Sequence, residues 1–413
     1  MSGKPVNWKL NVFLMWITQI MVMTGFDASM TFIPLLFRDN FGLVEQAQRG
    51  VYVSIFNFVG FFAYAVFCPI WGTLSDRFGV KIMLLRGFFV TCFFFPLMGY
   101  VTQPWMLIVL RFITAACAGT TAAANILLVK TVPDDRMGFS LGLLGTAIWS
   151  GAVLGNVLGG LIVDLYGYKV TFWICGILYF ISGVFTIFAR DAHTSMVSNS
   201  DNAAKKRKKN IVPTFTRAVT VIMAVMLFYN FCRRFETPYV AMLIELITGP
   251  EKAAFWTGIA GAATCIGAVL SGVVIGYLSD RMAPQKIIFP SLFLTAALLV
   301  VSGITKNLAV FTVSRTLMFF FSGSLFPVLQ KVLSTSTPQH KRGAVFGWST
   351  TFNNVGGMLS TLVSGWVIYI SDARGVFIAA ALLTALLIPV TLKGIKFAER
   401  QPYYIAHAGK KNT

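Results

Sequence analysis

Long apolar segments recur along the whole chain and are separated by short polar stretches. Each has about 20 residues or more, the length that an α-helix needs to cross the ~30 Å hydrocarbon core of a bilayer. The strict alternation that marks the strands of a membrane barrel is absent. The pattern predicts an all-α polytopic membrane protein with twelve transmembrane helices, at about 10–36, 50–74, 82–101, 105–130, 138–163, 170–189, 217–247, 254–279, 286–304, 308–333, 343–370 and 375–393.

Composition and charge agree with a membrane protein and fix its expected orientation. Of the 413 residues, 56% are hydrophobic and 12% charged, whereas soluble domains carry about 25% charged residues. A net charge of +19 raises nucleic acid as a partner, but most of the Lys and Arg residues lie on one side of the predicted membrane. This positive-inside bias predicts cytoplasmic N- and C-termini and argues against nucleic acid.

Other chemical signals are weak. No cleavable signal peptide is evident, because the first apolar run is too long and lacks a small-residue cleavage site. The six cysteines all fall inside predicted spans without CxxC spacing, which is typical of packed thiols. We therefore expect no metal and no cofactor.

A basic, polar stretch divides the chain after the sixth span. It contains Lys205-Lys206-Arg207-Lys208-Lys209, which is typical of a solvated cytoplasmic linker close to anionic lipid headgroups. The expected organisation is a six-helix bundle at 1–190, a linker at 191–216, a second six-helix bundle at 217–396 and a cytoplasmic tail at 397–413.

The two halves repeat at an offset of 204 to 205 residues. Gly72-Thr-Leu-Ser-Asp76-Arg77 returns as Gly276-Tyr-Leu-Ser-Asp280-Arg281, and single residues of several spans recur in register. The recurring pairs include Pro34 with Pro238, Arg111 with Arg315, Gly119 with Gly323, and Gly160 with Gly365. An internal duplication of this kind predicts two pseudo-symmetric bundles with the solute site between them near the membrane midplane.

The loop between spans two and three, Gly72-Thr-Leu-Ser-Asp76-Arg77-Phe-Gly79-Val-Lys81, resembles the signature loop of the major facilitator superfamily. The twelve-span layout, the central basic linker and the echo at Asp280-Arg281 agree with that resemblance over essentially the whole chain. The resemblance implies the major facilitator fold and a gating role for the loop, which latches the cytoplasmic side. The alternative is that its cations only enforce topology.

Span five carries Gly151, Gly155, Asn156, Gly159 and Gly160, and resembles the antiporter signature of the drug:proton antiporters. Small residues at these spacings let helix backbones approach closely, with or without a bearing on transport direction. Asn156 stands where the signature has proline, so the expected kink is replaced by a polar side chain.

Ionisable residues inside the spans carry most of the functional information, because each is costly in hydrocarbon unless it is paired or faces water. Arg111 in span four resembles the antiporters' arginine that is implicated in the proton step. Asp27 in span one and Glu236 in span seven are the deep carboxylates, and all three histidines lie outside the spans. We expect proton coupling through Asp27, Glu236 and Arg111. Alternatives are helix–helix hydrogen bonding for Asp27, and for Glu236 a structural ion pair with Arg233, three positions away.

A second set of polar residues is expected to line the substrate cavity. Amides and cations in mid-membrane need partners or water. The set is Arg233, Arg234, Arg315, Asn125, Asn353 and Asn354.

Three classes of function fit the sequence to different degrees. The resemblance implies proton-coupled efflux of small amphipathic or drug-like compounds by alternating access. The compact layout with short loops is typical of a bacterial plasma-membrane protein, and nothing in the sequence requires a partner subunit, so we expect a monomer. Four span arginines against two deep carboxylates favour, as an alternative, transport of an anionic metabolite or siderophore. A membrane enzyme or receptor is disfavoured, since HExxH, GxSxG and P-loop motifs are all absent.

Overall fold

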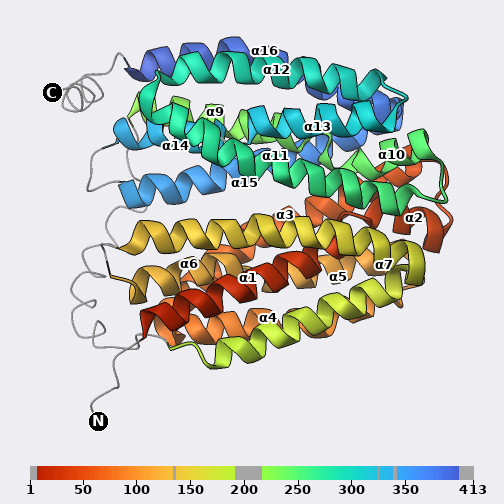
Figure 1. The fold of residues 1–413 in the computed structure, drawn as a ribbon, viewed down its shortest axis with the longest axis horizontal. Helices are drawn as coiled ribbons and strands as arrows, with labels where there is room; N and C mark the ends of the chain where they lie inside the picture. Colours follow the sequence, from red (N-terminus) through yellow and green to blue (C-terminus); the bar gives the residue numbers. More distant parts are fainter. Residues whose placement is uncertain (1–6, 134–135, 191–215, 324, 338–341, 400–413) are drawn as a thin grey trace.

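The computed structural model describes residues 7–133, 136–190, 216–323, 325–337 and 342–399, without the side chains at 76–77, 276, 279–280, 327, 342–344, 346–347 and 398–399. Over these ranges the chain forms helices and their connections, and no strand. The helices run along one common direction in two layers (Figure 1). Helices satisfy their own backbone hydrogen bonds, which lipid requires of any spanning segment. The prediction of an all-α membrane protein is confirmed.

Among the described residues, the first half has seven helices, and the second half has eight helices and one short 3₁₀ turn. The first half comprises α1 (Trp8–Met30), α2 (Ile33–Phe41), α3 (Gln46–Phe78), α4 (Val80–Met98), α5 (Pro104–Cys117), α6 (Thr120–Thr131) and α7 (Met137–Ile187). The second half comprises α9 (Arg217–Arg234), η2 (Thr237–Tyr239), α10 (Val240–Thr248), α11 (Ala253–Arg281), α12 (Pro284–Ile304), α13 (Leu308–Ser322), α14 (Leu325–Thr335), α15 (Arg342–Ile370) and α16 (Ala373–Glu399).

Each of the twelve predicted spans falls on helical residues, although helices and spans do not correspond one to one. Nine helical stretches within the described ranges are long and apolar enough to cross a membrane. One of them, α7, contains two predicted spans. The chain reverses at Gly167 (φ 79°), and the residues on both sides of Gly167 are helical (Figure 1). The linker predicted at 191–216 lies almost wholly outside the described residues, as does the tail from 400.

Interruptions of the helices repeat in the two halves. Pro34 sits at the start of α2 and Pro238 inside η2, so spans one and seven are both broken near their ends, where proline lacks a backbone donor. Spans four and ten each consist of two helices. Span four is divided into α5 and α6 beside Gly119, and span ten into α13 and α14 beside Gly323. The duplication seen in the sequence is therefore also a duplication of helix breaks.

The halves meet along two helix pairs, α7 with α11 and α3 with α15. Figure 1 shows that α1 begins and α16 ends at the same end of the bundle, called here the termini end; the opposite end is the far end. Gly160 of α7 packs so closely on α11 that an added Cβ would lie 2.9 Å from the Ala254 carbonyl oxygen. Backbones approach this closely because Gly160 faces Gly258 of α11, and neither residue has a side chain.

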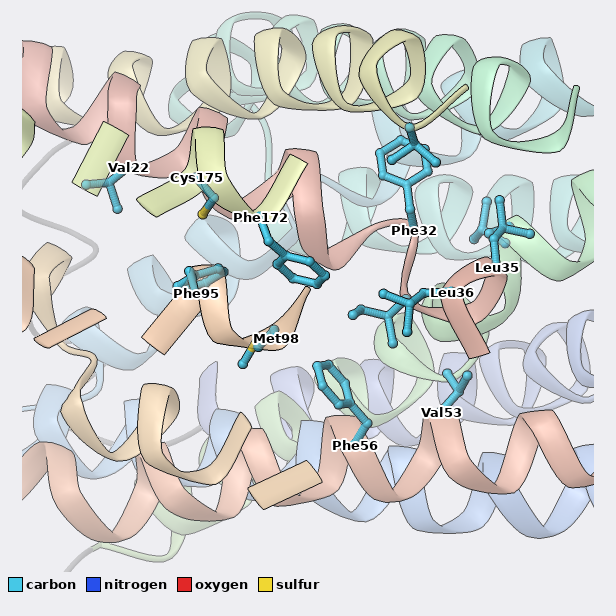
Figure 2. Packing of buried hydrophobic residues seen from close by; sticks show 14 of the residues in the cluster. Val22, Phe32, Leu35, Leu36, Val53, Phe56, Phe95, Met98, Phe172 and Cys175 are labelled. Atoms are coloured by element: carbon cyan, nitrogen blue, oxygen red, sulfur yellow. The ribbon is translucent and has the colours of Figure 1, made fainter. Parts of the chain in front are cut away.

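Buried apolar side chains fill the first half near the far end. Figure 2 shows Phe95 of α4 beside Phe172 of α7, with Leu36 of α2 and Phe56 of α3 in the same cluster. Large apolar side chains also cover the outer surface, and examples that are more than half exposed are Phe93, Leu165, Val273 and Trp366. A surface of this kind suits lipid rather than water.

Candidate functional site

A break in span four shapes the centre of the first half. Gly119 has φ 113°, a left-handed conformation that glycine adopts without strain, and it separates α5 from α6. The carbonyl groups freed by the break are paired. Trp71 Nε1 donates to Ala116 O at 2.6 Å, and Arg86 Nη2 donates to Cys117 O at 3.2 Å. The break is therefore held open by side chains of neighbouring helices, as broken helices in membranes require.

A cavity of about 250 Å³ lies against this break. Its wall is mostly aromatic and apolar, with few polar groups, which is the usual character of a small-molecule site. The lining residues that matter below are Phe26, Gly60, Phe61, Arg111, Gly119 and Asn354. Asn354 belongs to α15, so the second half contributes to the wall.

Arg111 lines this cavity between two phenylalanine rings. Its guanidinium carbon lies 5.5 Å from the ring centre of Phe26 and 5.3 Å from that of Phe56. It also rests on Gly60, where an added Cβ would lie 2.5 Å from Arg111 Nε. Within the described part of the chain no ion pair to Arg111 is found, and its buried Nε lacks a hydrogen-bond partner.

Asp27 lies in the last turn of α1, where that helix packs on the glycine face of α7. An added Cβ at Gly155 would lie 3.0 Å from Asp27 Cβ. The carboxyl group is partly exposed and interacts electrostatically with Arg234 of the other half. Among the described contacts its side chain makes neither a hydrogen bond nor an ion pair within 4.0 Å.

Arg233 and Arg234 end α9, and their side chains reach different aromatic neighbours. The Arg233 guanidinium lies 5.1 Å from the ring centre of Phe319, within the second half. That of Arg234 lies 5.5 Å from the ring centre of Phe61, across the boundary between the halves. Arg234 is exposed although it lies deep along span seven. An exposed cation at this depth indicates a water-accessible space between the halves.

Glu236 forms a buried ion pair with Arg315. The distance from Arg315 Nη1 to Glu236 Oε2 is 2.7 Å, and the two side chains are 4% and 2% exposed. The sequence spacing suggested Arg233 as the partner, on one helix face with Glu236. That interpretation is wrong, because α9 ends at Arg234 and the chain turns before Pro238. The repeat partner of Arg111 takes the carboxylate instead.

The three asparagines proposed for the cavity have different surroundings. Asn354 lines the cavity, whereas the backbone carbonyl of Asn353 accepts a hydrogen bond from Asn230 Nδ2 at 2.6 Å. Asn125 Nδ2 donates to Thr121 O one turn earlier in α6, at 3.0 Å. Of the three, only Asn354 borders the cavity directly in the described structure.

Asn156 lies where α1, α7 and α11 meet. Its Nδ2 donates to Ala152 O at 2.8 Å, and its Oδ1 accepts from Thr31 Oγ1 at 3.1 Å. Gly151 and Gly159 press on the α1 backbone, where an added Cβ would lie 2.6 Å from the carbonyl oxygens of Ile20 and Ala28. In place of a proline kink, the polar side chain cross-links two helices of the same half at a close crossing.

Comparisons with known proteins agree over the whole length. A family model described as Major Facilitator Superfamily matches residues 15–246 and 238–404. The chain belongs to the Major Facilitator Superfamily. Multidrug resistance protein MdtG of Proteus mirabilis (strain HI4320) is 27% identical over 380 residues, which cover 91% of this chain and 94% of that protein. MdtG of Rahnella sp. (strain Y9602) is also 27% identical, with 92% of each chain covered.

Solved structures of other transporters share the fold. A bacterial homologue of the human lysosomal transporter Spinster, in an inward-facing and occupied conformation, has a TM-score of 0.75 at 13% identity and covers 97% of this chain and 100% of that one. A D-xylose-proton symporter has a TM-score of 0.69 at 14% identity and covers 93% and 98%. The protein is thus a multi-pass membrane transporter and not an enzyme.

The superfamily's signature loop is only partly described. Gly72 lies in α3 with open space around it, and Gly79 separates α3 from α4 with φ 91°. Lys81 Nζ donates to Ile187 O at 2.5 Å, and Arg281 lies 4.3 Å from the ring centre of Tyr277. The side chains of Asp76, Arg77 and Asp280 lie outside the described residues, so their gating role stays a prediction.

A charged cluster at the far end was missed by the sequence reasoning. Arg38 Nε donates to Asp39 Oδ1 at 2.6 Å, and Tyr168 Oη donates to Asp39 Oδ2 at 2.6 Å. Across the boundary, Glu245 of α10 pairs with Arg38 and Arg49 at 3.0 and 2.8 Å. The available signal was position: these are charges at span ends on the side where the positive-inside rule predicts few cations.

Proposed function

We propose that this transporter exports small amphipathic compounds in exchange for protons, by alternating access of its two halves. The relatives named Multidrug resistance protein MdtG support this proposal, because the similarity extends over more than nine tenths of the chain. The aromatic and apolar cavity between α1, α3 and α5 supports it as well. The protein works as a monomer in a bacterial inner membrane, with the termini end in the cytoplasm.

The observation that carries the proton coupling is the contrast between the two deep carboxylates. Glu236 is sealed in an ion pair with Arg315, and a proton reaches it only if that pair opens. Asp27 is partly exposed and interacts with Arg234 of the opposite half. Asp27 therefore carries the proton, Glu236 serves a structural role, and Arg111 acts within the cavity.

Coupling follows from the position of Arg234. When Asp27 is charged, it attracts Arg234 across the boundary and holds the halves together at this depth. When a proton neutralises Asp27, that attraction is lost, and Arg234 is released for water or a solute. Protonation thus changes the relative free energies of the two facing states, which is what a coupling ion must do.

The conformation suits the first step of export. At the far end the halves are joined by Glu245 with Arg38 and Arg49, and by Ser54 with Tyr239, whose oxygens lie 2.8 Å apart. With the far end external, this is the state that receives a compound from the cytoplasm or inner leaflet. The loop from Gly72 to Lys81, with Asp280 and Arg281, latches the termini end in the opposite state.

The experiment is transport by the full chain reconstituted in liposomes with an imposed pH gradient. Three fluorescent compounds, a lipophilic cation (ethidium), a neutral dye (Nile red) and an amphipathic anion (8-anilinonaphthalene-1-sulfonate), identify the class that moves. For that compound, Asp27→Asn is expected to abolish acceleration by the pH gradient while exchange without a gradient continues.

Asp164→Asn is the matched control, since Asp164 is an exposed carboxylate of α7 that does not line the cavity. It should behave as the unmodified protein. Full gradient-driven accumulation by Asp27→Asn would refute the coupling role, and a lack of gradient dependence in the unmodified protein would refute proton exchange altogether.

A further inference from the structure

Arg111 and Arg315 occupy equivalent positions in the two halves, but among the described residues only Arg315 has an acidic partner. Arg315 has the carboxylate of Glu236 at 2.7 Å. At the repeat offset of 204, the position of Glu236 corresponds to Phe32 in the first half. The first half therefore lacks the acid that neutralises its arginine. A guanidinium in a largely apolar site without an anionic partner is costly, and the rings of Phe26 and Phe56 offset only part of that cost.

The cavity beside Arg111 offers a second positive element. The first residues of α6, Thr120 and Thr121, line the same cavity, and no side chain caps the N-terminus of this helix. The first turn of a helix has backbone N–H groups without intrahelical partners and carries a partial positive charge. Arg111 precedes Gly119 by eight residues, or about 12 Å along a helix. Two anion-binding elements thus face one cavity.

Nearby charges leave the centre positive. With Glu236 and Arg315 neutralising each other, the deep cations Arg111, Arg233 and Arg234 face the single carboxylate of Asp27 among the described side chains. No described ion pair joins Asp27 to Arg111. The cavity wall also carries aromatic rings, including Phe61, Phe95 and Tyr179, which suit a flat apolar body.

We infer that the cavity binds amphipathic organic anions, with the anionic group on the Arg111 guanidinium and the aromatic body against the rings of the first half. Arg111 is held for this contact by Gly60, whose missing side chain leaves room for the guanidinium. A planar guanidinium forms two parallel hydrogen bonds to a carboxylate, a geometry that lysine lacks. The inference rests on the proposed export function and narrows its substrate class.

The test compares three ligands of one shape and different charge. Radiolabelled 2-naphthoate, neutral 2-naphthamide and cationic 2-naphthylmethylammonium are bound at equilibrium to the full chain in nanodiscs of zwitterionic lipid, with empty nanodiscs as blank. The carboxylate is expected to bind at least about tenfold more tightly than the amide, since a hydrogen bond to a charged group is worth ~1.5–3 kcal/mol.

Two substitutions locate the anion. Arg111→Lys keeps the positive charge but removes the planar guanidinium that can form two parallel hydrogen bonds. Gly60→Ala keeps Arg111 but places a Cβ against its Nε. Both should weaken 2-naphthoate binding about tenfold and leave 2-naphthamide binding nearly unchanged, which also shows that the variants fold. Lys306→Gln removes an exposed cation at the far end and serves as the matched control.

Equal affinities for the acid and the amide, or unchanged 2-naphthoate binding by both variants, would overturn the inference. Because no gradient is applied, this outcome is separate from failure of the proposed function. If the protein exports ethidium with a proton gradient but binds 2-naphthoate and 2-naphthamide equally well, the proposed export function is supported and the inferred anion site is refuted.

Discussion

Glu245 of the second half is shared by Arg49 and Arg38 of the first. Its Oε2 accepts a hydrogen bond from Arg49 Nη1 at 2.8 Å, and its Oε1 lies 3.0 Å from Arg38 Nη1. The Arg49 side chain is 1% exposed, so water cannot replace the carboxylate while the halves stay together. The closed far end therefore depends on this contact, and its loss favours the state in which Arg49 reaches water.

The first prediction concerns Glu245→Gln. It leaves the buried Arg49 cation unpaired in the closed state, at a cost of about 3–5 kcal/mol. Opening of the far end relieves that cost, so the equilibrium between facing states shifts toward far-end opening. Hydrogen exchange of the far-end segments at 42–50 and 248–253 should become faster.

Glu251→Gln is the control for the first prediction, because Glu251 is an exposed carboxylate at the same end. It should leave exchange unchanged. Slower or equal exchange in Glu245→Gln would show that the pair does not hold the far end closed.

The second prediction separates the two deep carboxylates by stability. Glu236→Gln leaves Arg315, 4% exposed, without its partner, and we expect the free energy of unfolding to fall by about 3–5 kcal/mol. Asp27→Asn breaks no described ion pair and should lower stability far less. Thermal unfolding in detergent, followed by intrinsic fluorescence, measures both.

A double variant completes the second prediction. Glu236→Gln with Arg315→Met removes both charges, and a large part of the lost stability should return, since the cost comes from an unpaired charge. If the double variant is as unstable as the sum of the single ones, the pair has no coupling of this kind.

The fold followed from the sequence because lipid imposes one strong pattern. Each apolar run that predicts a span falls on helical residues, and the repeat pairs Pro34 with Pro238 and Gly119 with Gly323, which lie at helix breaks. The reversal of α7 at Gly167 also fell between two predicted spans. Apolar runs and the positions of proline and glycine are local signals, so they predict local structure well.

The site followed only in part, since its contacts join distant positions. The pairing of Glu236 with Arg233 assumed a continuous helix, and the end of α9 at Arg234 removed that basis. Gly60 and Arg111 are far apart in the sequence and touch only because α3 packs on α5. The contact of Glu245 with Arg49 joins the two halves, and neither the internal repeat nor the spacing of residues predicts such a contact.

The last prediction concerns the contact of the halves through glycine. Gly160→Ala would place a Cβ 2.9 Å from Ala254 O and 3.1 Å from Gly258 Cα, both backbone atoms of α11. Backbone cannot rotate away as a side chain can, so α7 and α11 must separate, at a cost of about 1–3 kcal/mol. Thermal stability should fall, and far-end exchange should rise as in Glu245→Gln.

The matched variant is Gly142→Ala on the same helix, where an added Cβ meets no atom within 4 Å. Alanine is also the better helix former by about 1 kcal/mol, so this variant should be as stable as the unmodified protein or more so. The difference between the two variants isolates the crossing of α7 and α11 from the general effect of adding a methyl group to a helix. Equal stability of the two would mean that α7 and α11 tolerate a wider separation, and that the other contacts between the halves keep them together.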